Sequence, residues 1–158
     1  MQNKATDFFS VKKISFEDIP SVFQLTSNLD FLNWSLKQFE KELEYPFTFA
    51  LVAKDKKEET IGYALFHLLS GESELLAIGV KKEFQKLSVG TALLNECISY
   101  LKASGIQKIF LEVREHNISA RHFYEKFLFK NIGLRKSYYT NGENAILYQK
   151  NINEESDA

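Results

Sequence analysis

Apolar positions recur along this chain with two spacings, one of about 2 residues and one of about 3.6. Strand-like runs lie at residues 10–14, 47–53, 61–69, 72–80, 108–114, 132–139 and 145–149. The turn Thr140-Asn141-Gly142 between the last two runs is typical of a hairpin. Helical spacing is found in the segments 19–29, 35–46, 88–105 and 117–127. This order predicts an α/β (α+β) fold, in which a mixed sheet carries helices on its faces and contains one strand–helix–strand crossover.

Capping signals support the predicted helix boundaries. Ser35, followed three residues later by Gln38, is typical of a capping box at a helix start. Gly105 is well placed to end the helix that begins near Ser88, because helices often terminate in a left-handed glycine. Asn117 or Ser119 caps the last predicted helix.

The segment Glu83–Leu94 joins a strand-like run to an amphipathic helix through a short polar turn. The first turn of a helix has about four N–H donors without intrahelical partners and a partial positive charge of roughly half a unit. Small residues at Ser88 and Gly90 leave room for an anion to approach. The main chain from Lys86 to Thr91 is therefore predicted to hold a pyrophosphate. We expect Ser88 to cap the helix without a positive φ.

Composition narrows the possible functions. The chain has 158 residues, 44% of them hydrophobic, which predicts one globular domain over residues 1–150 and a polar tail over 151–158. A net charge of −1 argues against nucleic-acid binding, and no apolar run approaches the roughly 20 residues that span a membrane. The single cysteine, Cys97, lies on an apolar helix face and fits a reducing cytoplasm. Three histidines lack the spacing of metal ligands, so no metal is expected: His67, His116 and His122.

Several short motifs in the second half of the chain occur together in one known family. Gln85-Lys86-Leu87-Ser88-Val89-Gly90 follows a Gln/Arg-x-x-Gly-x-Gly/Ala pattern, with serine where the first glycine is usual. Leu111-Glu112-Val113-Arg114, Ala120-x-x-x-Tyr124-Glu125 and Tyr138-Tyr139 accompany it. Together they resemble the GNAT-fold N-acetyltransferases, and most closely the RimI-type branch, which acetylates the N-termini of ribosomal proteins. The resemblance implies a mixed, mostly antiparallel seven-stranded sheet flanked by about four helices.

The resemblance implies that acetyl-CoA is the acetyl donor and that coenzyme A is a product. It assigns cofactor binding to Ile78, Gly79, Val80, Gln85, Lys86, Leu87, Ser88, Val89, Gly90, Thr91 and Asn117. Ile78, Gly79 and Val80 form an apolar triplet at the end of a strand, in which Gly79 suits a bulge or a close backbone approach. A main-chain N–H of this triplet can polarise the thioester carbonyl. Simpler roles stay open: Lys86 as a solvated side chain, Ile78 and Val80 as core residues, and Asn117 as a helix cap.

Three further residue roles follow from the resemblance. Glu112 occupies the position of the family's general base, and Tyr124 that of the acid that protonates the departing thiolate. Tyr138 and Tyr139 lie near the final hairpin, which in this family helps cover the acceptor groove, and their hydroxyls are expected to bind the first residues of a peptide acceptor. The structural alternatives are an ion pair of Glu112 with Arg114 or a lysine, and plain packing for the tyrosines.

The acceptor is expected to be a protein N-terminal α-amine, in particular that of a ribosomal protein. An α-amine titrates at about 7.7–8.0 and lysine at about 10.4, so the α-amine loses its proton more easily. A small-molecule or lysine amine is the alternative acceptor for the same machinery. Ser88 and Leu128, which stand where the family usually has glycine, also leave open a non-catalytic acyl-CoA-binding module. No feature of the sequence indicates an oligomeric state.

Overall fold

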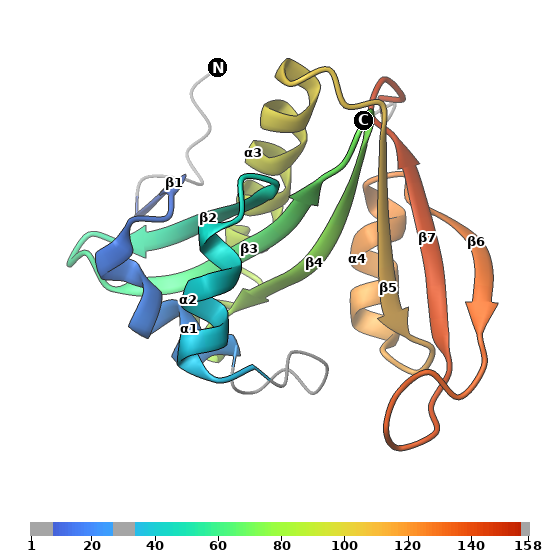
Figure 1. Cartoon of the computed structure of the whole chain (residues 1–158), viewed down its shortest axis with the longest axis horizontal. Coiled ribbons are helices and arrows are strands. Elements are labelled where there is room, and N and C mark those ends of the chain that lie inside the picture. The colour runs from blue at the N-terminus through green and yellow to red at the C-terminus, as the bar shows by residue number, and fades with distance from the viewer. Residues whose placement is uncertain (1–7, 27–33, 156–158) are drawn as a thin grey trace.

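The computed structural model describes residues 8–26 and 34–155, which form one seven-stranded sheet with helices on both faces (Figure 1). The spatial order of the strands is β1-β2-β3-β4-β5-β7-β6. All neighbouring strands are antiparallel except β4 and β5, so the mixed, mostly antiparallel sheet is confirmed. The strands are β1 (Phe9–Lys13), β2 (Thr48–Asp55), β3 (Thr60–Leu68), β4 (Glu72–Val80), β5 (Lys108–Arg114), β6 (Lys130–Arg135) and β7 (Ala145–Asn151).

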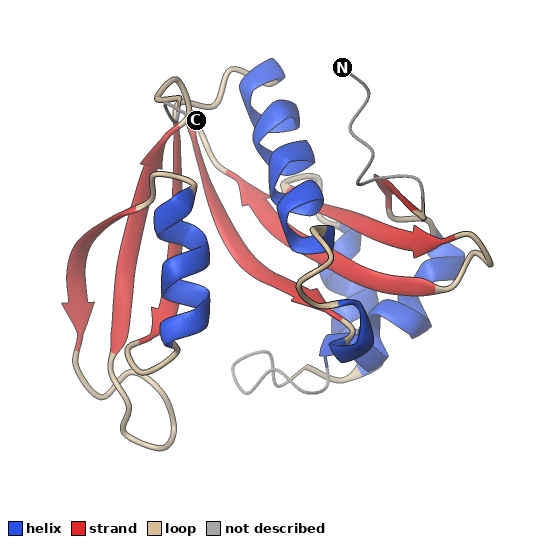
Figure 2. Ribbon diagram, turned by 180° about the vertical axis from the view of Figure 1, so that it is seen from behind, coloured by secondary structure: helices blue, strands red, loops and turns tan. Residues whose placement is uncertain are grey.

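Helices cover the two faces of the sheet in pairs (Figure 2). On one face lie α1 (Ile19–Thr26) and α2 (Leu36–Glu44), and their apolar residues form the smaller core with β2, β3 and β4. On the other face lie α3 (Val89–Ala103) and α4 (Ile118–Lys126), which enclose the larger core. The predicted order of strands and helices is confirmed, although Leu29, expected on the first helix, lies outside the described residues.

The predicted caps explain where three helices begin or end. Ser35 Oγ accepts a hydrogen bond from the Gln38 amide at 3.2 Å, and Gln38 Oε1 accepts one from the Ser35 amide at 2.7 Å. Asn117 Oδ1 accepts a hydrogen bond from the Ala120 amide at 3.2 Å at the start of α4. Gly105, with a φ of +78°, ends α3 in the left-handed conformation. All three signals are thus confirmed.

The sheet opens between β4 and β5. Their pairing covers only three positions and stops at Glu74 and Phe110. Immediately beyond, Leu65 pairs with Ala77 while Phe66 pairs with Leu75, so Leu76 is an extra residue in β4. Such a bulge bends its strand and increases the local twist. The two strands consequently diverge toward the C-terminal end of β5 (Figure 1).

Most element boundaries lie within about two residues of the expected ones, and two differences affect the site or the core. The strand expected over residues 132–139 ends at Arg135, because Ser137 has a φ of +51° and leaves the extended conformation. Tyr138 and Tyr139 therefore lie in the loop between β6 and β7, and a turn closes this loop with a 2.8 Å hydrogen bond from the Gly142 amide to the Tyr139 carbonyl. At the C-terminus, Ile152 is only 3% exposed and packs in the larger core, so the polar tail begins after it rather than at 151.

Candidate active site

The loop between β4 and α3 has a backbone suited to binding an anion. Lys86 and Ser88 have φ values of +62° and +67°, and Val89 then begins α3. A left-handed residue next to a right-handed one turns successive main-chain N–H groups toward the same side, which forms an anion-binding nest. The N-terminus of α3 adds the N–H donors of its first turn.

The expectation that Ser88 avoids a positive φ is wrong. Its backbone is left-handed, and its exposed side chain makes no capping hydrogen bond to α3. A non-glycine residue in this region costs about 1–2 kcal/mol. Leu128 behaves in the same way after α4, with a φ of +65°. Both residues that replace a family glycine therefore keep the conformation that glycine adopts most easily.

A pocket of about 710 Å³ lies between this loop, the end of β4 and α4. It is lined by nine of the residues expected to bind the cofactor: Ile78, Gly79, Val80, Gln85, Lys86, Ser88, Gly90, Thr91 and Asn117. Two others do not line it, because the Leu87 side chain is 47% exposed outside it and Val89 is buried in the core. Gln85 fixes the loop to the strand through a 3.1 Å hydrogen bond from its Nε2 to the Val80 carbonyl.

Helix α4 contributes polar lining that the sequence analysis did not assign. Ser119, His122 and Lys126 line the pocket at helical spacings of three and four, which place them on one side of α4. In the sequence, these residues could have been found by their helical spacing after Asn117, which was already expected to bind the cofactor. Among the described residues that line the pocket, Lys86 and Lys126 are charged and none is acidic. The pocket therefore suits a polyanion such as a diphosphate.

Gly79 permits a close approach, as expected, whereas the bulge lies three residues earlier at Leu76. A Cβ atom at Gly79 would lie 2.7 Å from Cε1 of Tyr63, a distance that real Cβ atoms do not tolerate. The glycine is thus required because the Tyr63 ring lies directly over the main chain of β4.

Glu112 lies on the face of β5 that is turned toward the side of α1 and α2. Its neighbours Leu111 and Val113 are buried in the larger core, and strand alternation directs Glu112 to the opposite face. Glu112 Oε1 lies 3.3 Å from Nε of Arg135, and the carboxylate side chain is 18% exposed. Arg135 is therefore an ion-pair partner of Glu112 that the sequence did not indicate.

Tyr124 lies on the other side of β5. It is 8% exposed, it lines the pocket beside α4, and it belongs to the same core as Leu111 and Val113. Burial raises the pKa of the Tyr124 phenol, so the hydroxyl is protonated throughout the neutral range. Its ring also packs edge-on against Phe123 and Phe129, so the packing role is confirmed alongside its place in the pocket.

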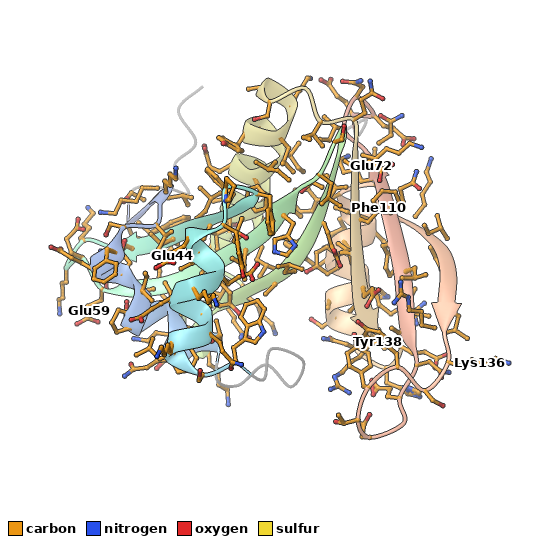
Figure 3. The ribbon with its side chains drawn as sticks, in the orientation of Figure 1. Glu44, Glu59, Glu72, Phe110, Lys136 and Tyr138 are labelled. Carbon is orange, nitrogen blue, oxygen red and sulfur yellow. The ribbon has the colours of Figure 1, made fainter. Side chains whose placement is uncertain are left out.

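Tyr138 and Tyr139 hold different positions in the β6–β7 loop. Tyr138 is 47% exposed, and a hydrogen bond with the Glu112 carboxylate raises the pKa of its hydroxyl. Tyr139 is buried beneath the Arg114 guanidinium, 4.0 Å from its ring centroid, and burial raises its pKa to about 12. Figure 3 shows Tyr138 near the open end of β5, whereas Glu72 and Phe110 lie near the closed end. Tyr138 thus joins Glu112 at the gap, and Tyr139 supports the loop from beneath.

Two other kinds of site have no support in residues 8–26 and 34–155. No cluster of three or more histidine, cysteine or acidic side chains is placed to hold a metal ion there. None of the helices in these ranges combines the length and the apolar character needed to cross a membrane.

Fold, anion-binding loop and split sheet together define an acyltransferase architecture. The chain belongs to the Acetyltransferase (GNAT) family, whose sequence model matches residues 13–129, and it is an N-acetyltransferase. It is 31% identical over 147 residues to the "Putative [ribosomal protein bS18]-alanine N-acetyltransferase" of Bacillus subtilis, an alignment that covers 92% of this chain and 97% of that protein.

Solved structures agree with this assignment at the level of the fold. The ribosomal-protein-S18-alanine N-acetyltransferase of Escherichia coli superposes with a TM-score of 0.82 at 24% identity, over 94% of this chain and 97% of that one. Arabidopsis thaliana NAA60 in complex with acetyl-CoA gives a TM-score of 0.83 at 18% identity, over 92% and 99% of the two chains. The GNAT family uses acetyl-CoA as its acetyl donor.

Proposed function

We propose that this protein transfers the acetyl group of acetyl-CoA to a protein N-terminal α-amine, in particular that of a ribosomal protein. One observation carries the proposal: the candidate groups lie on opposite faces of a sheet that is open between them. The anion-binding pocket and Tyr124 lie on the side of α3 and α4, whereas Glu112 and Tyr138 lie on the side of α1 and α2. A donor and an acceptor that enter from opposite faces meet in the gap between β4 and β5.

The donor-binding residues are those of the pocket. Main-chain N–H groups from Lys86 to Thr91 hold the diphosphate, and Lys86 and Lys126 balance its charge. The diverging part of β4, from Ile78 to Val80, offers main-chain groups to the amides of the pantetheine arm. Ser88 in place of glycine leaves the donors of this loop intact, because its φ is the one a glycine would adopt. Acetyl-CoA supplies an acetyl group activated as a thioester.

The chemistry needs one proton acceptor and one proton donor. Glu112 takes a proton from the acceptor amine, whose nitrogen then forms the new C–N bond. Arg135 forms an ion pair with the carboxylate, and Tyr138 orients it through a hydrogen bond. Tyr124 gives its proton to the sulfur as the C–S bond breaks, and burial keeps this phenol protonated beforehand. Each group contributes about 10²–10⁴ in rate.

The choice of acceptor rests on two arguments. An α-amine is neutral in a larger fraction of molecules at pH 7 than a lysine amine, which favours it as the nucleophile. The relatives from Bacillus subtilis and Escherichia coli are named for acetylation of an alanine of ribosomal protein S18. We place the reaction in the cytoplasm, in keeping with a single cysteine that is buried and unpaired.

The decisive experiment incubates the purified protein with acetyl-CoA and three acceptors: a peptide with a free N-terminal alanine, the same peptide N-terminally blocked but carrying an internal lysine, and spermidine. We expect mass spectrometry to find acetylation at the free α-amine only. Acetylation confined to the lysine or to spermidine would replace the protein acceptor by another amine. Saturable acetyl-CoA binding without turnover of any acceptor in a wider panel would indicate the non-catalytic module.

A further inference from the structure

The hydroxyl of Tyr63 is buried and has no hydrogen-bond partner among the described residues. Tyr63 lies in β3, is 1% exposed, and pairs across the sheet with Gly79 of β4. Among the described residues, its hydroxyl is the one buried side-chain polar atom with no hydrogen-bond partner in the protein. Buried hydroxyls are normally satisfied, and exceptions are concentrated where a ligand or a reaction uses them.

The Tyr63 side chain extends from β3 over Gly79 of β4. A Cβ atom on Gly79 would meet Cε1 at 2.7 Å, Cζ at 3.2 Å and the hydroxyl oxygen at 3.3 Å, so the outer half of the ring lies over this glycine. Paired Cα atoms in antiparallel strands are about 4.5–5.5 Å apart, which is shorter than a tyrosine side chain. The hydroxyl therefore lies beside Gly79, one of the residues that line the donor pocket.

At the level of Gly79, β4 no longer pairs with β5, because the pairing of these two strands stops at Glu74. Burial raises the pKa of Tyr63, and the charge interaction with Tyr124 raises it further, so the Tyr63 hydroxyl is protonated throughout the neutral range. Tyr124 lines the donor pocket. One protonated hydroxyl, from β3, thus lies beside the pocket residue Gly79, and a second, from α4, belongs to the lining of the same pocket.

We propose that the Tyr63 hydroxyl donates a hydrogen bond to the carbonyl oxygen of the donor's acetyl thioester. This inference rests on the proposed function and adds a side-chain donor to the reaction centre. As the C–N bond forms and the C–S bond breaks, the amine proton goes to Glu112 and the sulfur receives the proton of Tyr124. Tyr63 keeps its proton throughout and stabilises the negative charge that develops on the carbonyl oxygen.

The Tyr63→Phe variant tests this role, with Tyr100→Phe as the matched control on the exposed side of α3. We expect kcat of Tyr63→Phe to fall by about 10²–10³, the loss typical of removing one oxyanion donor. The melting temperature should stay the same or rise, because the lost hydroxyl has no partner in the free protein. Tyr100→Phe should match the wild type in both measurements.

Binding gives a readout that does not depend on turnover. Calorimetry compares a ketone analogue of acetyl-CoA, in which CH₂ replaces the thioester sulfur, with ethyl-CoA, which lacks the carbonyl. The Tyr63→Phe variant should lose about tenfold or more in affinity for the ketone, in line with the removal of a hydrogen bond to a buried partner, and none for ethyl-CoA.

Two outcomes separate this inference from the proposed function. If the wild type acetylates the peptide and Tyr63→Phe retains its kcat and its preference for the ketone, the role of Tyr63 is refuted and the transferase function stands. If the wild type itself binds neither analogue and acetylates nothing, the proposed function fails first. Equal loss of affinity for both analogues would make Tyr63 a packing residue.

Discussion

Replacing Ser88 by glycine should stabilise the protein, although glycine usually destabilises. The Ser88 side chain is exposed and makes no cap to α3, so the substitution removes no interaction of that kind. It relieves the cost of a left-handed serine, about 1–2 kcal/mol. Glycine loses more backbone entropy on folding, which takes back about 0.5–1 kcal/mol. The expected gain is about 0.5–1 kcal/mol, or roughly 1–4 °C in melting temperature for a chain of this size.

Urea denaturation and thermal melting of the free protein measure this gain. The matched control is Ser99→Gly, an equally exposed serine inside α3, where glycine should destabilise by a few tenths of a kcal/mol to about 1 kcal/mol. A higher free energy of unfolding for Ser88→Gly together with a lower one for Ser99→Gly would show that the backbone conformation decides the effect. A destabilised Ser88→Gly variant would refute the strain at position 88. Coenzyme A affinity should not fall, because the main-chain donors stay in place.

Three other outcomes are expected. Glu112→Gln should lower kcat at least tenfold at neutral pH, with an unchanged melting temperature; a wild-type rate would remove Glu112 as the base. Tyr124→Phe should lower kcat by about 10²-fold or more with nearly unchanged coenzyme A affinity, and equal loss of binding would indicate packing alone. For Asp18, burial raises the pKa, but hydrogen bonds from Lys54 and Ser15 outweigh burial and lower it overall. The folded-state pKa thus lies below the unfolded value of about 3.9, so the stabilisation is complete above that pH and is lost as the pH falls through the folded value. Asp18→Asn should therefore unfold more readily in urea at pH 7 and show a shallower loss of stability below about pH 4, whereas an identical pH dependence would contradict the linkage.

The helices and most strands could be predicted because their signals are local. The Ser35–Gln38 capping box, the Asn117 cap and the glycine at 105 each depend on neighbours within a few residues. The resemblance to one family placed most of the pocket residues, since its motif runs through the loop before α3.

Features that depend on contacts distant in sequence escaped prediction. Arg135 of β6 reaches Glu112 of β5 across β7, so their contact depends on the order of these strands in the sheet. The ring of Tyr63 lies over Gly79 because β3 and β4 are paired in one particular register. The positive φ of Ser88 could not be predicted, because serine disfavours the left-handed region by only about 1–2 kcal/mol, and the contacts of the whole loop can outweigh that cost.

The extra residue in β4 has a thermodynamic consequence. A continuous sheet would satisfy the main chain of β4 and β5 permanently, but it would leave no seam in which two substrates could react. In the proposed function, the pantetheine arm and its two amides would occupy the place that a continuing β5 would fill beside β4 beyond the bulge at Leu76. The liganded enzyme should therefore resist unfolding better than the free one, by about 2.7 kcal/mol when the donor is present at one hundred times its dissociation constant. Under this proposal the acetyl donor would stabilise the fold as well as react.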